Sequence, residues 1–348
     1  GESTLSVIEA YPERFHLEVV SAHSSVDKLV GIIERFRPKH VILSDQSEAT
    51  ALIEKMPGSF NGSLAFGESA LTEAASAPEV DVVMAAIVGG AGLVSTYAAV
   101  TAGKRVCVAN KEALVMGGQL MMSAAETKGA MLLPIDSEHN AIFQCLPDSY
   151  VVGQPISGLR RLVLTCSGGP FREWSIDAMA AATPNQAVAH PNWSMGKKIS
   201  TDSATMINKV YEVIEAKNIF NIPYDKIEIL IHPKSYIHSL IKFSNGLIKI
   251  IAHDTTMKIP IFNTINNDND KKLNSKIVNF EILNNLNFNK VDLNRYPMVK
   301  LMKHLSGKSS LFETVIVSAN DKLVDLFLNN KNKVVYKNNS NYMAVALA

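Results

Sequence analysis

The sequence predicts an α/β fold in which a parallel sheet comes first, a mixed α+β region follows, and helices end the chain. Three observations support this prediction. Apolar runs alternate with helical patterns through about the first 135 residues. Strand signals and one long helical pattern follow Tyr150, and the region from about Asn266 is rich in lysine and asparagine. With 348 residues, the chain is long enough for two or three packed domains.

The first region predicts strands covered by helices on both faces. Val82–Val88 and Arg105–Ala109 are short, continuous apolar runs that suit buried parallel strands. Further strands are expected in "FHLEVVSAHS" and "KHVILSD", and helices in "VDKLVGIIERF", "EATALIEKM", "LVSTYAAVTAG" and "GGQLMMSAAETKG". This alternation is typical of nucleotide-binding sheets, whose ligands lie beyond the carboxyl ends of the strands. The loops in "AAIVGGAGL" and "VANKEAL" are expected at those ends.

The later regions predict fewer but longer elements. Strands are expected in "LRRLVLTCSGG" and "IEILIHPKSYIHSLIKF", and one strong helix in "DSATMINKVYEVIEAKNIF". Helices are also expected around "PMVKLMKHL" and "ETVIVSANDKLVDLFL" near the end of the chain.

Composition limits the classes of partner. The formal net charge is +1, from 34 basic and 33 acidic residues, so no overall field favours nucleic acid or a membrane surface. The cysteines, Cys107, Cys145 and Cys166, are scattered, which favours a reducing compartment over disulfides or structural zinc. No signal peptide or membrane-spanning run is visible. Any anionic ligand therefore needs a local site.

Two carboxylates follow the apolar run in "LLPIDSEHNAIFQ". Asp136 and Glu138 are two residues apart, so in an extended segment both point to the same side. Carboxylates that close repel each other unless a proton or a cation neutralises one, and oxygen ligands suit Mg²⁺ or Mn²⁺. The alternative is a solvated turn in which Asp136 or Ser137 caps the following helix.

A second group of polar residues lies in "STDSATMINKVYEVIEA". Ser203, Asn208 and Lys209 are expected in the first turns of a helix, where free N–H groups favour an anion. Glu212 is three residues past Lys209 and on the same face, so it is a candidate third carboxylate. The alternative is an ordinary Lys209–Glu212 ion pair on a solvated face, and Glu215 fits the role of a flanking charge.

Two loops add polar and aromatic side chains. "TCSGGPFRE" offers Ser167 with two glycines that let the backbone approach a ligand. "HPNWSMGKKIS" holds His190 and has the composition of a lid, although a tryptophan in a loop often only anchors packing. His232 and His238 lie in a strand-like run and are expected to be structural.

Together these segments resemble the 1-deoxy-D-xylulose 5-phosphate (DXP) reductoisomerase family. The resemblance runs from near residue 80 to near residue 240 through "VMAAIVGGAGL", "VANKEALV", "LLPIDSEHNAIFQ", "SGGPFRE", "HPNWSMGKKISTDSATMINK", "EVIEA" and "IHPKSYIHS". It implies that Asp136, Glu138 and Glu212 bind Mg²⁺ or Mn²⁺ and that Lys111, Glu138 and His190 are catalytic. It implies substrate contacts by Lys111, Ser137, Glu138, Ser167, His190, Ser203, Asn208, Lys209 and Glu212. It places Gly1, Asn110, Glu112 and Gly196 at the NADPH cofactor, and Trp193 and Met195 in the lid.

The resemblance also implies the organisation and activity. It implies an NADPH-binding Rossmann-like domain in 1–135, a catalytic and dimerisation domain in 136–266, a linker in 267–293 and a helical domain in 294–348. The activity would be rearrangement and reduction of DXP to 2-C-methyl-D-erythritol 4-phosphate in the non-mevalonate isoprenoid pathway. A homodimer is expected through the sheet around "IEILIHPKSYIHSLIKF", in a bacterial cytoplasm or a plastid, without nucleic-acid or membrane partners.

The sequence departs from the family at its ends. The family's glycine-rich loop, G-S-T-G-S-I-G, would lie ahead of Gly1, with the first strand of the sheet, and "NNSNYMAVALA" stops before the family's last helices. At His23, Ser24 and Ser25 the usual turn near the cofactor 2′-phosphate differs. Two alternatives follow: a module that binds metal and sugar phosphate without turnover, and a metal-assisted sugar-phosphate isomerase that needs no nicotinamide.

Overall fold

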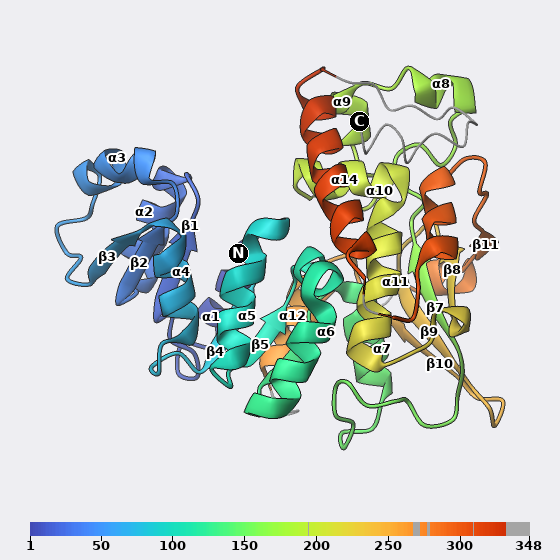
Figure 1. The fold of residues 1–348 in the computed structure, drawn as a ribbon, viewed down its shortest axis with the longest axis horizontal. Helices are drawn as coiled ribbons and strands as arrows, with labels where there is room; N and C mark the ends of the chain where they lie inside the picture. Colours follow the sequence, from blue (N-terminus) through green and yellow to red (C-terminus); the bar gives the residue numbers. More distant parts are fainter. Residues whose placement is uncertain (194, 267–271, 277–278, 309, 332–348) are drawn as a thin grey trace.

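The α/β class is confirmed by a computed structural model, which describes residues 1–193, 195–266, 272–276, 279–308 and 310–331. Figure 1 shows a small parallel sheet (β1–β3) with its helices at the left end of the molecule, a second parallel sheet near the middle and a larger mixed sheet toward the right. Within the expected linker, residues 267–271 and 277–278 lie outside the described residues, as does the end of the chain from residue 332.

The first sheet is parallel, with the order β1-β2-β3. Its strands are β1 (Val19–Ala22), β2 (His40–Leu43) and β3 (Ser63–Phe66). The helices are α2 (Val26–Phe36), α3 (Ala49–Glu54), preceded by the 3₁₀ turn η1 (Gln46–Glu48), and α4 (Gly67–Ser76). The helix α2 forms because Val26, Leu29 and Ile33 recur on one face, and that face packs in the same core cluster as β2.

The second sheet is also parallel, with the order β4-β5-β6. Its strands are β4 (Val82–Ala85), β5 (Arg105–Val108) and β6 (Met131–Pro134), and its helices are η2 (Gly90–Gly92), α5 (Leu93–Thr101) and α6 (Lys111–Lys128). Among the described residues the parallel strands form two separate sheets, since β1 and β4 are not paired. An N-terminal helix, α1 (Glu2–Ala10), packs against α12 (Lys258–Ile265).

The third sheet is mixed, with the order β10-β9-β7-β8-β11. Its strands are β7 (Leu159–Cys166), β8 (Ile227–Ile231), β9 (Ile237–Phe243), β10 (Ile248–Ala252) and β11 (Asn289–Lys290). The run "IEILIHPKSYIHSLIKF" is two strands that flank β7, parallel on one side and antiparallel on the other. The expected linker contributes the edge strand β11 and the helix α13 (Phe280–Asn284), so the described part of it is not structureless.

Helices cover this sheet and extend to the top of Figure 1. They are α7 (Ser137–Cys145), α8 (Ile176–Ala180), α9 (Pro184–Ala187), α10 (Lys197–Thr205), α11 (Ile207–Phe220), η3 (Tyr224–Lys226), η4 (Pro297–His304) and α14 (Phe312–Leu328). The expected α-helix at "PMVKLMKHL" is the 3₁₀ helix η4. No helix among the described residues is long and apolar enough to cross a bilayer.

The single helix expected over "DSATMINKVYEVIEAKNIF" is wrong. The chain breaks it into α10 and α11 at Met206, which adopts a left-handed conformation with φ 62°. The Met206 side chain is 2% exposed and belongs to the main core cluster, so burial of the side chain offsets the unfavourable backbone conformation. The break places Ser203 at the end of one helix and Asn208 and Lys209 at the start of the next.

We expect Leu29→Ala to lower the free energy of unfolding of the first sheet and its helices by about 2–5 kcal/mol. The reason is that Leu29 is fully buried between α2 and β2, so its removal leaves a cavity. The control is Ile53→Ala in α3, which is 56% exposed and should cost no more than about 0.5 kcal/mol. Urea unfolding followed by circular dichroism measures both, and equal losses would contradict the packing described.

Candidate active site

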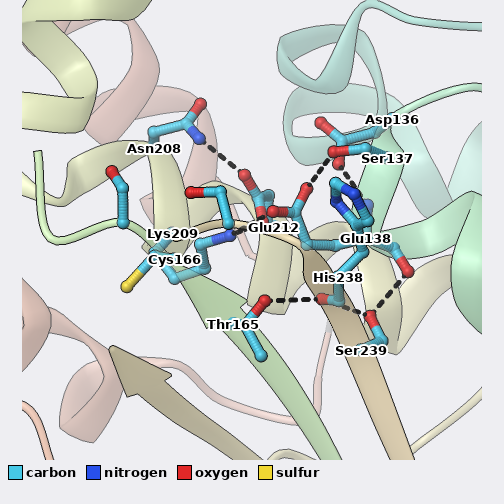
Figure 2. Close-up of polar contacts among 12 residues, drawn as sticks. Asp136, Ser137, Glu138, Thr165, Cys166, Asn208, Lys209, Glu212, His238 and Ser239 are labelled. Atoms are coloured by element: carbon cyan, nitrogen blue, oxygen red, sulfur yellow. Dashed lines mark hydrogen bonds and ion pairs between the residues drawn. The ribbon is translucent and has the colours of Figure 1, made fainter. Parts of the chain in front are cut away.

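A cavity of about 230 Å³ lies where the carboxyl end of β6, the helix α11 and the loops after β7 meet. Figure 2 shows the side chains of Asp136, Ser137 and Glu138 on one side of Glu212, with Asn208 and Lys209 on the other. All of the expected substrate, metal and lid residues line it: Lys111, Asp136, Ser137, Glu138, Ser167, His190, Trp193, Met195, Ser203, Asn208, Lys209 and Glu212. The fold therefore brings together residues that are as much as 101 positions apart in the chain.

The acidic pair caps a helix and also belongs to a buried cluster. Asp136 is the N-cap of α7, where its Oδ1 accepts a hydrogen bond from the Glu138 N–H at 3.4 Å. The alternative of a solvated turn is wrong, because the side chains of Asp136 and Glu138 are only 10% and 15% exposed. Ser239 of β9 donates to the Glu138 carbonyl oxygen at 2.7 Å and so fixes the first turn of α7 to the mixed sheet.

Three carboxylates converge in the cavity. Asp136, Glu138 and Glu212 each offer one oxygen, and these oxygens all lie within 4.8 Å of one another. Ligand oxygens around an octahedral Mg²⁺ at about 2.1 Å lie roughly 3–4 Å apart, so a small adjustment would let all three reach one ion. The all-oxygen donor set also suits Mg²⁺ or Mn²⁺ rather than a thiolate-binding metal.

Two lysines bridge these carboxylates. Lys111 Nζ lies 2.6 Å from Asp136 Oδ2 and 3.0 Å from Glu212 Oε1. Lys209 Nζ lies 3.2 Å from Glu138 Oε1 and also pairs with Glu212 Oε2. The solvated Lys209–Glu212 pair considered from the sequence is therefore wrong, because both side chains are nearly completely buried.

Burial and charge shift the pKa values of this cluster in opposite directions. Burial would lower the pKa of Lys111, but Asp136 and Glu212 raise it well above its usual range. Burial would raise the pKa of Asp136, but Lys111 and His139 hold it well below its usual range. Burial and repulsion from Glu212 raise the pKa of Glu138 to about 8, so this carboxyl holds a proton at neutral pH when no cation is bound.

Glu215 was expected as a flanking charge, and this expectation is wrong. Its side chain is 1% exposed, and its Oε2 lies 3.5 Å from His139 Nδ1, which is also 3.3 Å from Asp136 Oδ1. Burial would lower the pKa of His139, but Glu215 and Asp136 raise it to about 9. The histidine is therefore charged at neutral pH and donates its other N–H to the Glu212 carbonyl oxygen at 2.9 Å. The sequence signal for this contact was the position of His139 three residues after Asp136, which places both side chains on the same side of the helix.

Ser167 and His190 meet at the opposite wall. His190 Nδ1 accepts hydrogen bonds from the backbone N–H groups of Asn192 at 3.2 Å and Trp193 at 3.0 Å. Burial lowers the pKa of His190 to about 4, so the ring is neutral and carries its proton on Nε2. Nε2 then donates to Ser167 Oγ at 3.0 Å. Gly169 lets this loop approach α10, because a Cβ there would lie 2.6 Å from the Ser203 carbonyl oxygen.

The expected lid lies against the mixed sheet. Asn192 Nδ2 donates to the Pro233 carbonyl oxygen at 2.7 Å and to Ser235 Oγ at 2.8 Å. The Trp193 ring makes an edge contact with His238, whose ring stacks on His253 at 3.8 Å between centroids. His238 is thus a packing residue, and Trp193 has a packing role besides lining the cavity.

The expected cofactor residues are not among those that line this cavity. Asn110 caps α6, since its Oδ1 accepts from the Ala113 N–H at 2.9 Å, and its Nδ2 donates to the Gly89 carbonyl oxygen at 3.0 Å. Glu112 pairs with Lys198 at 2.8 Å, in the first turn of the helix that Gly196 caps. Gly1 is the exposed N-cap of α1, and no contact to the other three appears in the described part of the chain.

We expect Glu212→Gln to raise the dissociation constant for Mg²⁺ by about 100-fold or more, because it removes one of three converging carboxylates. Glu215→Gln is the matched control on the same helix, and we expect an effect of about tenfold or less because Glu215 faces His139 instead. Isothermal titration calorimetry measures both. Equal losses would contradict the assignment of Glu212 to the cation site.

Family models cover most of the chain. The model described as 1-deoxy-D-xylulose 5-phosphate reductoisomerase matches residues 1–118, and two models of reductoisomerase C-terminal domains match residues 132–220 and 254–337. Among curated proteins, the DXP reductoisomerase of Laribacter hongkongensis is 43% identical over 328 residues, which is 94% of this chain and 84% of the relative. That of Pelagibacter ubique is 42% identical over 337 residues, covering 96% and 84%.

Solved structures agree with the sequence relatives. A DXP reductoisomerase in complex with NADPH, fosmidomycin and magnesium superposes with a TM-score of 0.89 at 36% identity, covering all of this chain and 84% of the other. The enzyme from Zymomonas mobilis in complex with NADPH gives a TM-score of 0.84 at 37% identity, covering 100% and 86%. Since both the sequence and the fold match over nearly the whole chain, the protein belongs to the 1-deoxy-D-xylulose 5-phosphate reductoisomerase family.

Proposed function

We propose that the protein is a DXP reductoisomerase, which rearranges DXP and reduces it with NADPH in the presence of Mg²⁺ or Mn²⁺, forming 2-C-methyl-D-erythritol 4-phosphate. The observation that carries the proposal is the convergence of Asp136, Glu138 and Glu212 in the same cavity as a set of hydroxyl, amide and ammonium donors. Relatives with 42–43% identity carry this name, and solved relatives bind NADPH, magnesium and the inhibitor fosmidomycin. The reaction belongs to the non-mevalonate isoprenoid pathway.

The three carboxylates would hold the divalent cation. Counting Glu215 as well, the charge cluster has four carboxylates, while Lys111, Lys209 and His139 supply three positive charges among the described residues. One carboxylate is therefore left without a counter-charge, which is the condition that a bound cation would satisfy. When bound, the cation supplies an electrophile for two adjacent substrate oxygens.

The other cavity residues would bind and orient the sugar phosphate. Lys209, Asn208 and Ser203 gather donors at the junction of α10 and α11, in the same cavity as Ser167 and His190. This is the position we propose for the phosphate group, with Ser137 and Lys111 near the reacting carbons. Trp193 and Met195 would cover the substrate and exclude water. Phosphate binding away from the reacting carbons would contribute the energy that positions them.

Asn110, Glu112 and Gly196 fit a nicotinamide cofactor at the ends of β4 and β5. The backbone there is tightly packed, since a Cβ at Gly92 would lie 2.4 Å from Asn110 Nδ2. A glycine at a helix N-terminus after a parallel strand is typical of dinucleotide sites, because it lets the ligand approach the backbone. NADPH supplies the hydride, and Glu112, Asn110 and Gly196 would orient its ring toward the cavity.

We further propose a homodimer through the edge of the mixed sheet. The edge strand β10 and the turn before it expose Leu247, Ile248 and Ile250, at 60%, 55% and 46%. Large apolar residues on an unpaired edge favour association with another copy. We also propose domains at residues 1–135, 136–266 and 294–348, which agrees with the start of α7 directly after β6. No nucleic-acid or membrane partner is proposed.

We expect the protein to oxidise NADPH when DXP and Mg²⁺ are both present, and to stop when EDTA removes the metal. The measurement is the loss of NADPH absorbance. A folded protein that binds fosmidomycin and Mg²⁺ without oxidising NADPH would instead support binding without turnover. Product formed from DXP without NADPH would support the isomerase alternative.

We expect Mg²⁺ binding in the absence of substrate to weaken as the pH falls below about 8. The Glu138 carboxyl, whose pKa is raised to about 8, holds a proton at lower pH that a cation must displace. The apparent affinity at pH 7 should be about tenfold below its plateau above about pH 9, with close to one proton released per ion. Calorimetry in two buffers of different ionisation enthalpy counts the protons, and a binding enthalpy independent of buffer at pH 7 would contradict this assignment.

A further inference from the structure

The loop Ser167–Gly169, which we call the anion loop, depends on other side chains for its conformation. Gly168 and Gly169 are consecutive residues with positive φ, 83° and 69°. Because neither has a Cβ, their own side chains do not restrict the two peptide units to this geometry. The orientation of each carbonyl group therefore rests on what it contacts.

Two side chains donate to consecutive carbonyl oxygens of this loop. Arg172 Nη1 donates to the Ser167 oxygen at 2.8 Å, and Tyr296 Oη donates to the Gly168 oxygen at 2.7 Å. Tyr296 is completely buried and comes from a segment 128 positions later in the chain. Both residues line a second cavity of about 210 Å³, while Ser167 and Gly168 line the candidate active site. The anion loop thus lines the candidate active site, and the two side chains that donate to it line the second cavity.

The Gly168 carbonyl group is coupled to the Ser167 hydroxyl through one peptide unit. The carbonyl of Gly168 and the N–H of Gly169 belong to the same planar group, so fixing one fixes the other. That N–H donates to Ser167 Oγ at 3.0 Å, and His190 Nε2 donates to the same oxygen at 3.0 Å. With both acceptor positions of Oγ occupied, the hydroxyl hydrogen is left to donate into the cavity.

We propose that Tyr296 is a positioning residue that fixes the Gly168–Gly169 peptide and thereby presents the Ser167 hydroxyl as a hydrogen-bond donor to a phosphate or phosphonate oxygen. The inference rests on the proposed function, because it assumes that the anion is the phosphate group of the substrate. It assigns a role to the segment after the expected linker, for which the sequence offered no signal. Tyr296 itself does not line the candidate active site, so its proposed effect on the substrate is indirect.

The test is Tyr296→Phe, which removes only the hydroxyl. We expect the dissociation constant for fosmidomycin, a phosphonate, to rise about three- to tenfold, the usual effect of one hydrogen bond. The KM for DXP should rise similarly with kcat changed less than about twofold, because the phosphate contact is made throughout the reaction. The dissociation constant for Mg²⁺ should not change. Calorimetry and steady-state kinetics measure these quantities.

The matched control is Tyr150→Phe. The Tyr150 hydroxyl also donates to a backbone carbonyl oxygen at 2.7 Å, that of Gln154, but away from both cavities. We expect it to leave fosmidomycin affinity unchanged. A folded Tyr296→Phe variant with unchanged fosmidomycin affinity would overturn the inference. So would an equal weakening of fosmidomycin and Mg²⁺, which would indicate general loosening of the site.

A double-mutant cycle tests whether Tyr296 acts through Ser167. In the Ser167→Ala background, Tyr296→Phe should cause no further loss of fosmidomycin affinity, whereas additive losses would overturn the inference. If Tyr296→Phe does not fold, Arg172→Gln, at a residue whose side chain is 25% exposed, tests through the adjacent Ser167 carbonyl whether the conformation of the anion loop controls the Ser167 hydroxyl. A coupled loss supports the inference and additivity overturns it. If the wild-type protein does not oxidise NADPH but the two substitutions are still coupled in fosmidomycin binding, the result contradicts the proposed function and supports the inference.

Discussion

The buried excess of negative charge between α7 and α11 is the constraint on which the site depends. Asp136, Glu138, Glu212 and Glu215 lie close together in space. Burying these carboxylates is unfavourable unless each charge is neutralised. Lys111, Lys209 and His139 supply three positive charges, and burial raises the pKa values of Glu138 and Glu215 to about 8, so one of these two carboxyls can hold the proton that neutralises the fourth. A divalent cation would replace that proton. The metal chemistry and the pH dependence therefore have the same physical origin.

This charge cluster is held by the packing around it. Helix α11 is buried on nearly every side, with Tyr211 and Phe220 among the largest fully buried side chains. His139 links α7 to α11 through the Glu212 carbonyl oxygen, and its ring stacks on Phe220. Ser239 fixes the first turn of α7 to β9. Because the helices cannot move apart without exposing this apolar surface, the carboxylates stay close in spite of their mutual repulsion.

The anion side of the cavity has a different construction. It consists of loops whose glycines allow close approach, and side-chain hydrogen bonds hold them: Tyr296 and Arg172 donate to carbonyl oxygens of the anion loop, and Asn192 of the lid donates to the Pro233 carbonyl oxygen. These hydrogen bonds fix the orientation of the groups that would donate to the phosphate. The carboxylates that would bind the metal remain on the other side of the proposed substrate. In the proposed function, the two sides together would separate the phosphate from the reacting end of a sugar phosphate.

The sequence alone determined the α/β class, the order of most strands and helices, and the residue types of the candidate site, because these follow from local periodicity and from motifs that occupy single segments. Their spacing made Asp136, Glu138 and Glu212 candidates, and the resemblance to the reductoisomerase family implied that they bind the metal. Only the tertiary structure decided that α10 and α11 are separate helices, that Glu215 is buried against His139, and that Tyr296 supports the anion loop. Each of these depends on contacts between segments far apart in the chain. Periodicity shows which face of an element is buried, but it does not show which other segment covers that face.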